Sequence, residues 1–164
     1  MSPSLWSDRL ELRPLTAEMA RAVVDGERDD SWAHDFPQDG DMVIARLTHD
    51  RGQASADASL FGHHHVFERS TGTLVGTAGF FGPPGESGDV TLGYGIVPSA
   101  RGRGIATEAV RCLVELATSD ERVRSVLADT TRLNVASQRV LERVGFTPVS
   151  DDGDTIYFAL ALRA

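Results

Sequence analysis

The sequence predicts a single α/β domain over residues 1–164, built on a mixed sheet of about seven strands with about four helices. Three observations predict this fold class. The length of 164 residues suits one domain. A content of 41% hydrophobic and 24% charged residues is ordinary for a soluble globular protein. Segments with the two-residue period of strands also alternate along the chain with segments of helical period.

The first third of the chain predicts one strand followed by two helices. Residues 9–13, RLELR, alternate between charged and apolar side chains, which is typical of a half-buried strand. Thr16 is placed to cap a helix over residues 17–24, and a second helix is expected over residues 42–50. Two irregular segments complete this part: residues 25–41, which hold seven carboxylates, and residues 52–59, which are rich in small side chains.

Six strands and two helices are expected in the rest of the chain. The strands are rich in β-branched and aromatic residues, and glycine- and proline-containing turns separate several of them. The first helix follows the loop RGRG, with apolar residues recurring at helical spacing from Ile105. The second helix begins at Asn134, and Gly145 stands where a C-terminal cap belongs. The six strands cover residues 64–69, 73–81, 89–97, 125–130, 146–149 and 155–162, the last two forming a hairpin.

Composition and charge exclude several classes of protein. A net charge of −8 argues against a nucleic-acid-binding surface. The chain has no apolar run of membrane-spanning length, and its first residues lack the pattern of a signal peptide, so a cytoplasmic protein without a membrane partner is expected. A single cysteine, Cys112, excludes a disulfide framework and a multi-cysteine metal site, and it is expected to pack in the interior. All 16 basic residues are arginine, which excludes a P-loop lysine and favours a G/C-rich, bacterial coding sequence.

Residues 94–109, YGIVPSARGRGIATEA, form the segment that predicts chemistry. A strand leads into a loop with two glycines and two arginines, and a helix begins at once. The free N–H groups of a first helical turn form an anion site, and Gly102 and Gly104 allow the backbone to approach a phosphate closely. A pyrophosphate is therefore the expected ligand. Two alternatives are a solvated glycine-rich turn and a dinucleotide loop, although Thr107 stands where the last glycine of GxGxxG belongs.

The same segment resembles the acyl-CoA pyrophosphate loop of the GNAT N-acetyltransferase superfamily, R/Q-x-x-G-x-G/A, with Arg101, Gly104 and Ala106 at its defined positions. IVPSARGRGIATEA and NVASQRVLERVGF, the latter over residues 134–146, resemble the branch that acetylates ribosomal-protein N-termini, the Rim type. RLELRPL near the start and TGTLVGTAGF over residues 71–80 fit the same branch. The resemblance therefore covers almost the whole chain.

The resemblance implies a splayed, mostly antiparallel sheet that admits acetyl-CoA between two central strands. It implies acetyl transfer to a primary amine, of a protein N-terminus or a small molecule, by direct attack in a ternary complex, without a metal, in a monomer or homodimer. A backbone N–H near Ile96 or Val97 would polarise the thioester carbonyl, Asn134 would contact the pantetheine arm, and Ser137 would donate to the leaving thiolate. The residues implied to bind the pyrophosphate are Arg101, Gly102, Arg103, Gly104, Ile105, Ala106 and Thr107. Asn134 as a helix cap and Ser137 as a first-turn residue have purely structural alternatives.

The residue that accepts the amine's proton is the least defined part of this site. Thr91 stands where relatives often carry glutamate, which leaves Asp89 on the same strand face and Asp129 on the neighbouring strand as catalytic candidates. At pH 7 a protein α-amine is already roughly 10–20% neutral, a deficit of about 1 kcal/mol, against roughly 4–5 kcal/mol for lysine. A weakly basic amine is therefore favoured as acceptor, and the acidic residues 25–41 would attract it.

Two other interpretations stay open at the level of sequence. The threonine at position 91 also suits a non-catalytic acyl-CoA-binding module, and a nucleotide-dependent oxidoreductase is a more distant alternative. The triple histidine at residues 63–65 suggests a metal site, but neighbouring strand residues alternate faces, so that only His63 and His65 could converge. A packed or solvated strand is the expectation there.

Overall fold

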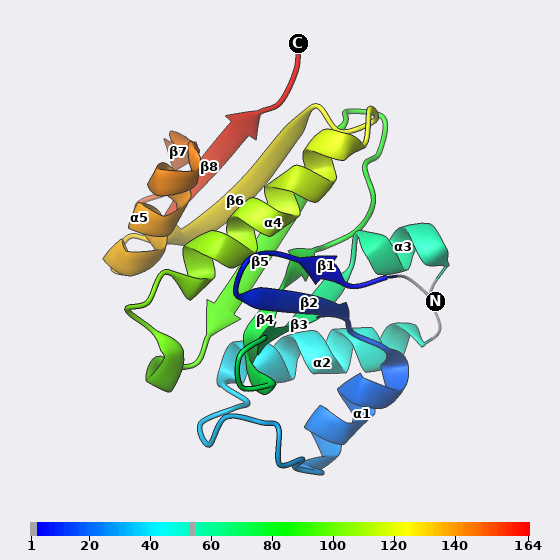
Figure 1. Cartoon of the computed structure of the whole chain (residues 1–164). Helices are drawn as coiled ribbons and strands as arrows, with labels where there is room; N and C mark the ends of the chain where they lie inside the picture. Colours follow the sequence, from blue (N-terminus) through cyan, green and yellow to red (C-terminus); the bar gives the residue numbers. More distant parts are fainter. Residues whose placement is uncertain (1–2, 53–54) are drawn as a thin grey trace.

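The computed structural model describes residues 3–52 and 55–164, and these form one mixed sheet with the strand order β1-β2-β3-β4-β5-β6-β8-β7 (Figure 1). The strands are β1 (Leu5–Trp6), β2 (Leu10–Pro14), β3 (His63–Glu68), β4 (Thr73–Phe80), β5 (Asp89–Ile96), β6 (Ser125–Thr131), β7 (Thr147–Asp151) and β8 (Thr155–Ala161). The helices are α1 (Ala17–Asp25), α2 (Asp39–Arg51), α3 (Ala56–Leu60), α4 (Ile105–Ser119) and α5 (Val135–Val144), with a short 3₁₀ turn at Pro98–Ala100. The predicted fold class is confirmed.

Three predictions about individual elements were wrong. The short strand β1 was not expected, because two residues carry no periodic pattern. The helix α3 begins inside the predicted loop 52–59 and ends one residue beyond it, at Leu60; residues 53–54 of that loop fall outside the described part of the chain. The helix α2 starts at Asp39 instead of residue 42, because the Asp41 carboxylate accepts the Gln38 N–H at 2.8 Å and so closes its first turn. Other boundaries differ from the predictions by one or two residues.

The helix caps predicted at Thr16 and Gly145 are present. The Thr16 hydroxyl accepts the Met19 N–H at 3.1 Å at the start of α1. Gly145 closes α5 in a left-handed conformation, with φ of 114°.

The pairing of the central strands β5 and β6 is short. All other neighbouring strands are antiparallel, whereas β5 and β6 run parallel and pair only at Asp89–Ser125, Val90–Val126 and Thr91–Leu127. Beyond Thr91 the strand β5 continues to Ile96, bonded to β4 alone. The sheet is therefore mostly antiparallel and splayed at its centre, as the resemblance implied.

The helices cover opposite faces of this sheet. At one face, the Thr77 hydroxyl of β4 donates to Asp41 of α2 at 2.6 Å. Thr77 pairs with His65 of β3, and Glu68 of β3 points to the other face, where it bonds Arg103 at the start of α4. α4 contacts β2, β4 and β5 there and also contacts α5. The helices α1 and α2 lie side by side, well apart from the pair α4 and α5 (Figure 1).

The triple histidine belongs to the core. His63, His64 and His65 are all buried in β3, and burial lowers the pKa of each to about 4, so their rings are neutral at pH 7. Among the described residues no group of three potential metal ligands comes together. Cys112 is also buried. None of the helices in the described ranges has the length and apolar character needed to span a membrane.

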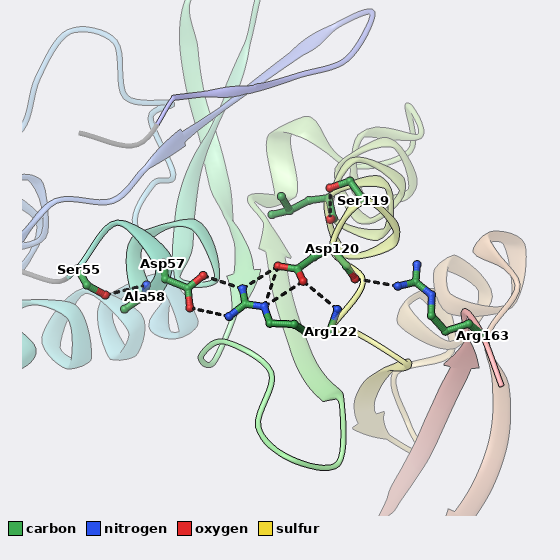
Figure 2. Close-up of polar contacts among 8 residues, drawn as sticks. Ser55, Asp57, Ala58, Ser119, Asp120, Arg122 and Arg163 are labelled. Carbon is green, nitrogen blue, oxygen red and sulfur yellow. Dashed lines mark hydrogen bonds and ion pairs between the residues drawn. The ribbon is translucent and has the colours of Figure 1, made fainter.

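A surface network ties α3 to the turn between α4 and β6 (Figure 2). The guanidinium of Arg122 donates to both oxygens of Asp57 on α3, at 2.8 and 3.2 Å, and to Asp120 at 2.7 Å. The backbone carbonyl of Asp120 in turn accepts from Arg163 near the end of the chain, at 2.9 Å. These contacts fix a short helix that has little core of its own.

Candidate active site between the splayed strands

The splayed end of β5 turns part of its backbone toward open space. The N–H of Val97 donates to Val75 O at 2.9 Å, so it faces β4. The carbonyl of Ile96 instead accepts from the Arg101 side chain at 2.9 Å, on the opposite side of the strand. Because backbone groups alternate along a strand, the N–H groups of Ile96 and Tyr94 also face the gap toward β6. Of the two expected carbonyl-polarising donors, Ile96 N–H therefore faces the gap, and Val97 N–H is already bonded.

The loop after β5 presents a row of free donors. Arg101 N–H donates to Pro98 O at 3.2 Å, and the first helical N–H to find a partner is that of Glu108, which bonds Gly104 O at 3.0 Å. In the described part of the chain, none of the N–H groups of residues 102–107 has a hydrogen-bond acceptor. Gly104 forms the N-cap with φ of +78°, a conformation that disfavours any side chain. The positive end of α4 therefore points into open space.

The two arginines of this loop have different surroundings. Arg103 makes two hydrogen bonds with Glu68 of β3, at 2.8 and 2.7 Å, and this pairing holds the pKa of Glu68 below its usual value. Its charge is thus largely balanced by protein. The guanidinium of Arg101 bonds the carbonyl of Ile96 and stays beside the gap. Arg101 is therefore the cation of the loop that is oriented toward the splayed strand.

Arg9, in the turn between β1 and β2, bonds the loop that precedes α4. Its guanidinium donates to Arg103 O and to the Glu108 carboxylate, both at 2.8 Å. Glu108 also accepts from Ser7, at 2.6 Å, and these bonds lower its pKa against the opposing effect of burial. Glu108 thus connects the start of α4 to the turn between β1 and β2.

Two hydroxyl groups meet where the splay opens. Ser137 on the first turn of α5 lies 2.7 Å from the hydroxyl of Tyr94 on β5. Asn134 caps α5, its side-chain oxygen accepting the Ser137 N–H at 3.1 Å. Tyr94 is half-buried, and burial raises its pKa. Sequence reasoning missed Tyr94, although it begins the segment that resembles the family loop.

The two predicted proton acceptors lie away from this hydroxyl pair. Asp89 is exposed and pairs with Ser125 at the closed end of the splay. Asp129 is exposed on β6 and shares the face of Leu127, which pairs with Thr91. It therefore stands across the gap from β5, on the α2 side of the sheet. Neither carboxylate lines the cavity that borders the splayed strand.

That cavity has a volume of about 460 Å³ and lies between α2 and the strands β3, β4 and β5. Its floor includes Gly95, where an added Cβ would meet no atom within 4 Å. Its one lining carboxylate is Asp41, only 6% exposed, and burial raises its pKa. The ring of His63 also lines it. The sequence placed Asp41 among seven acidic residues and gave no sign that it alone turns inward.

A larger hollow of about 680 Å³ lies beside α4 near the turn between β1 and β2. Its walls carry several charged side chains of both signs, and of the predicted ligand-binding residues only Gly104 and Thr107 border it. It does not reach Ile96, Tyr94 or Ser137. We therefore take the smaller cavity, which borders the splayed strand, as the candidate active site.

The sequence pattern of the acetyltransferase (GNAT) domain family matches residues 9–147. The chain therefore belongs to the GNAT acetyltransferase family, as its motifs predicted. Two curated proteins of Bacillus subtilis are similar to it. An uncharacterized N-acetyltransferase, YjdG, is 33% identical over 81 residues, which is 49% of this chain and 48% of the relative. A probable N-acetyltransferase, YjcK, is 34% identical over 85 residues, 51% of this chain and 47% of the relative. The matched part spans about half the length of these relatives.

Solved structures share the fold over nearly the whole chain. A GNAT-family acetyltransferase from Bordetella pertussis superposes with a TM-score of 0.67 at 25% identity, covering 98% of this chain and 99% of that one. A ribosomal-protein-serine acetyltransferase structure from Vibrio cholerae gives a TM-score of 0.68 at 24% identity, over 98% and 99%. The ribosomal-protein α-N-acetyltransferase RimL, solved with coenzyme A, gives 0.67 at 19% identity, over 97% and 98%. At these identities the last two structures show the fold alone.

Proposed function

We propose that the chain transfers an acetyl group from acetyl-CoA to a primary amine by direct attack in a ternary complex, with residues 1–164 acting as one domain. The observation that carries this proposal is the continuity of β5 with the loop at the start of α4. A strand edge with free backbone groups runs directly into the free N–H groups of residues 102–107. An extended amide chain that ends in a pyrophosphate has the chemistry to bind both.

The residues divide the reaction between them. Residues 101–107 bind the pyrophosphate through backbone N–H groups, and the Ile96 N–H polarises the thioester carbonyl. Asn134 contacts the pantetheine arm with the amide group that its capping bond leaves free. The hydroxyl pair of Tyr94 and Ser137 protonates the leaving thiolate, and their 2.7 Å separation lets the proton lost by one be replaced from the other. The proton that the attacking amine releases then restores the pair.

The acceptor remains the less defined substrate. The absence of a glutamate at position 91 favours an amine that is partly neutral at pH 7, such as a protein α-amine or a weakly basic small amine. An assay across an α-amine peptide, a lysine side-chain analogue and small amines tests this preference. A lysine analogue turned over at a rate that stays flat above pH 8 would contradict it. We also propose that this protein is bacterial, as these relatives are, and that it is cytoplasmic.

The first experiment is thermal unfolding with acetyl-CoA, CoA and NADP, each added separately. A ligand at about 100 times its dissociation constant stabilises a protein by roughly 2.7 kcal/mol, which means a shift of several degrees for a domain of this size. We expect both CoA species to raise the melting temperature and NADP to leave it unchanged. No shift with either CoA species would refute the proposed donor site.

The second experiment separates an enzyme from a binding module. Release of CoA thiol is followed with a panel of primary amines, and Ser137→Ala is compared with the wild type. We expect turnover that Ser137→Ala reduces at least tenfold without loss of the CoA-induced shift. Binding of acetyl-CoA without turnover of any amine would favour a non-catalytic acyl-CoA-binding module, the alternative that the threonine at position 91 suggests.

A further inference from the structure

Asp41 is an unusual carboxylate for its position. It is 6% exposed and lines the cavity beside β5, and its two oxygens accept from Thr77 Oγ1 at 2.6 Å and from Gln38 N–H at 2.8 Å. Both donors are neutral. None of the arginine or histidine side chains in the described ranges forms an ion pair with it. Burial raises the pKa of Asp41, and a cation bound beside the carboxylate would stabilise its ionised form.

The space beside Asp41 can hold such a cation. The carboxylate borders a cavity of about 460 Å³ that reaches Gly95 and Ile96 on the splayed strand. Thr77, which holds Asp41, pairs directly with Gly95, so the carboxylate lies over the strand next to β5. A group bound to Asp41 is therefore held on the α2 face, next to the strand whose Ile96 N–H faces the gap.

The rest of the cavity selects against further charge. Apart from Asp41, its walls on α2 and at the end of β4 carry the apolar side chains Val43, Ile44 and Phe81. Its one arginine, Arg101, would repel a second positive group. The imidazole of His63 is neutral at pH 7, because burial lowers its pKa. The cavity thus offers one negative charge in largely apolar surroundings.

We propose that Asp41 binds the acceptor amine as its ammonium ion, before the amine loses the proton that it must lose to attack, and that the site selects amines with a single positive charge on an apolar stem. This inference rests on the proposed acetyltransferase function and specifies its acceptor. Asp41 holds the acceptor by a charge-assisted hydrogen bond, with Thr77 keeping the carboxylate in orientation. Charged hydrogen bonds of this kind change affinity by about 10- to 100-fold.

The test compares Asp41→Asn with Asp39→Asn. Both variants remove one negative charge from the first turn of α2, but Asp39 is exposed and does not line the cavity. Hexylamine is the probe, at saturating acetyl-CoA and pH 9, where a larger share of its lysine-like amine is neutral than at pH 7. We expect Asp41→Asn to raise the KM for hexylamine about 10- to 100-fold and Asp39→Asn to change it less than twofold. Both variants should keep the wild-type melting shift with CoA.

The preference for an uncharged stem is tested with a matched pair of amines. Hexylamine and 1,6-diaminohexane have equal length and differ by one terminal ammonium group. We expect the wild type to favour hexylamine at least tenfold in kcat/KM. Preference for the diamine would overturn the proposed selectivity.

Thr77 gives a second test that does not alter a charge. Thr77→Val removes the hydroxyl that orients Asp41, whereas Thr77→Ser keeps it. We expect Thr77→Val to raise the KM for hexylamine several-fold and Thr77→Ser to preserve it, which a purely structural role of Asp41 would not produce. This pair also serves if Asp41→Asn does not fold.

Three results would overturn the inference. They are equal KM values in Asp41→Asn and Asp39→Asn, a loss of the CoA-induced shift in Asp41→Asn, or a larger rise in KM for Asp129→Asn than for Asp41→Asn. Failure of the proposed function is a different result, because the wild type would then release no CoA with any amine.

Discussion

Acidification is expected to destabilise the protein between pH 6.5 and 4, because three consecutive neutral histidines are buried in β3. Their pKa values are lowered from 6.5 to about 4 by burial of His63, His64 and His65. In the unfolded chain each ring takes up a proton as the pH falls below 6.5, while the folded protein resists protonation until about pH 4. The stabilisation is therefore complete above pH 6.5 and is lost progressively as the pH falls.

The size of the effect follows from the pKa difference. A pH of 5 is 1.5 units below the ordinary pKa of an imidazole, so protonation stabilises the unfolded chain by about 2 kcal/mol per ring. Three rings together give about 6 kcal/mol, a large share of the 5–15 kcal/mol that is typical of domains. Asp41 acts in the opposite direction, because burial raises its pKa.

Urea unfolding at pH 7 and at pH 5, followed by tryptophan fluorescence, measures this loss. His64→Leu isolates one ring, because neither ring nitrogen of His64 has a hydrogen-bond partner in the described structure. We expect this variant to be at least as stable as the wild type at pH 7 and to lose about 2 kcal/mol less on acidification. His49→Gln, on the exposed side of α2, is the control and should leave the loss unchanged. A wild-type loss below about 2 kcal/mol at pH 5 would refute the reasoning.

Four further substitutions test the glycines and the surface network. Gly76→Ala should destabilise the fold by about 3 kcal/mol in urea unfolding, because its Cβ would lie 2.2 Å from Gly95 O. Gly95→Ala is the control: its Cβ would meet open space, so stability should change by less than about 0.5 kcal/mol. Gly104→Ala should cost about 1–2 kcal/mol and reduce the melting shift with acetyl-CoA, because the position has φ of +78°; an unchanged shift would mean that the loop does not contact the ligand. Arg122→Ala should lower the melting temperature slightly at low salt, and the difference should shrink in 0.5 M NaCl; a difference independent of salt would mean that packing against Asp57 matters more than charge.

Local patterns in the sequence were sufficient for most of the fold. Thr16, Asn134 and Gly145 mark helix ends because capping is a property of a few adjacent residues. The free N–H groups at the start of α4 were predictable for the same reason, since strand, glycine loop and helix follow one another directly. The short elements β1 and α3 were missed because they carry too few residues for a period to appear.

The acceptor side of the site depends on contacts between distant segments. Asp41, Thr77 and Gly95 come together only because β4 lies between β3 and β5 and α2 crosses above them. Nothing in the acidic stretch distinguishes Asp41 from its neighbours, apart from its place three residues after Gln38. Tyr94 was missed for a related reason, since its partner Ser137 is 43 positions away and meets it only across the splay.

The narrow seam between β5 and β6 divides the sheet into two plates, β1–β5 and β6–β8, joined at three pairs of residues. α4 braces this hinge, because it contacts β2, β4 and β5 on one plate and α5, which contacts β6, on the other. The helix that presents the free N–H groups thus also connects the two parts of the sheet. A molecule that fills the gap and bonds to this helix adds contacts between the two parts of the sheet. Binding at the site therefore makes the whole sheet more rigid.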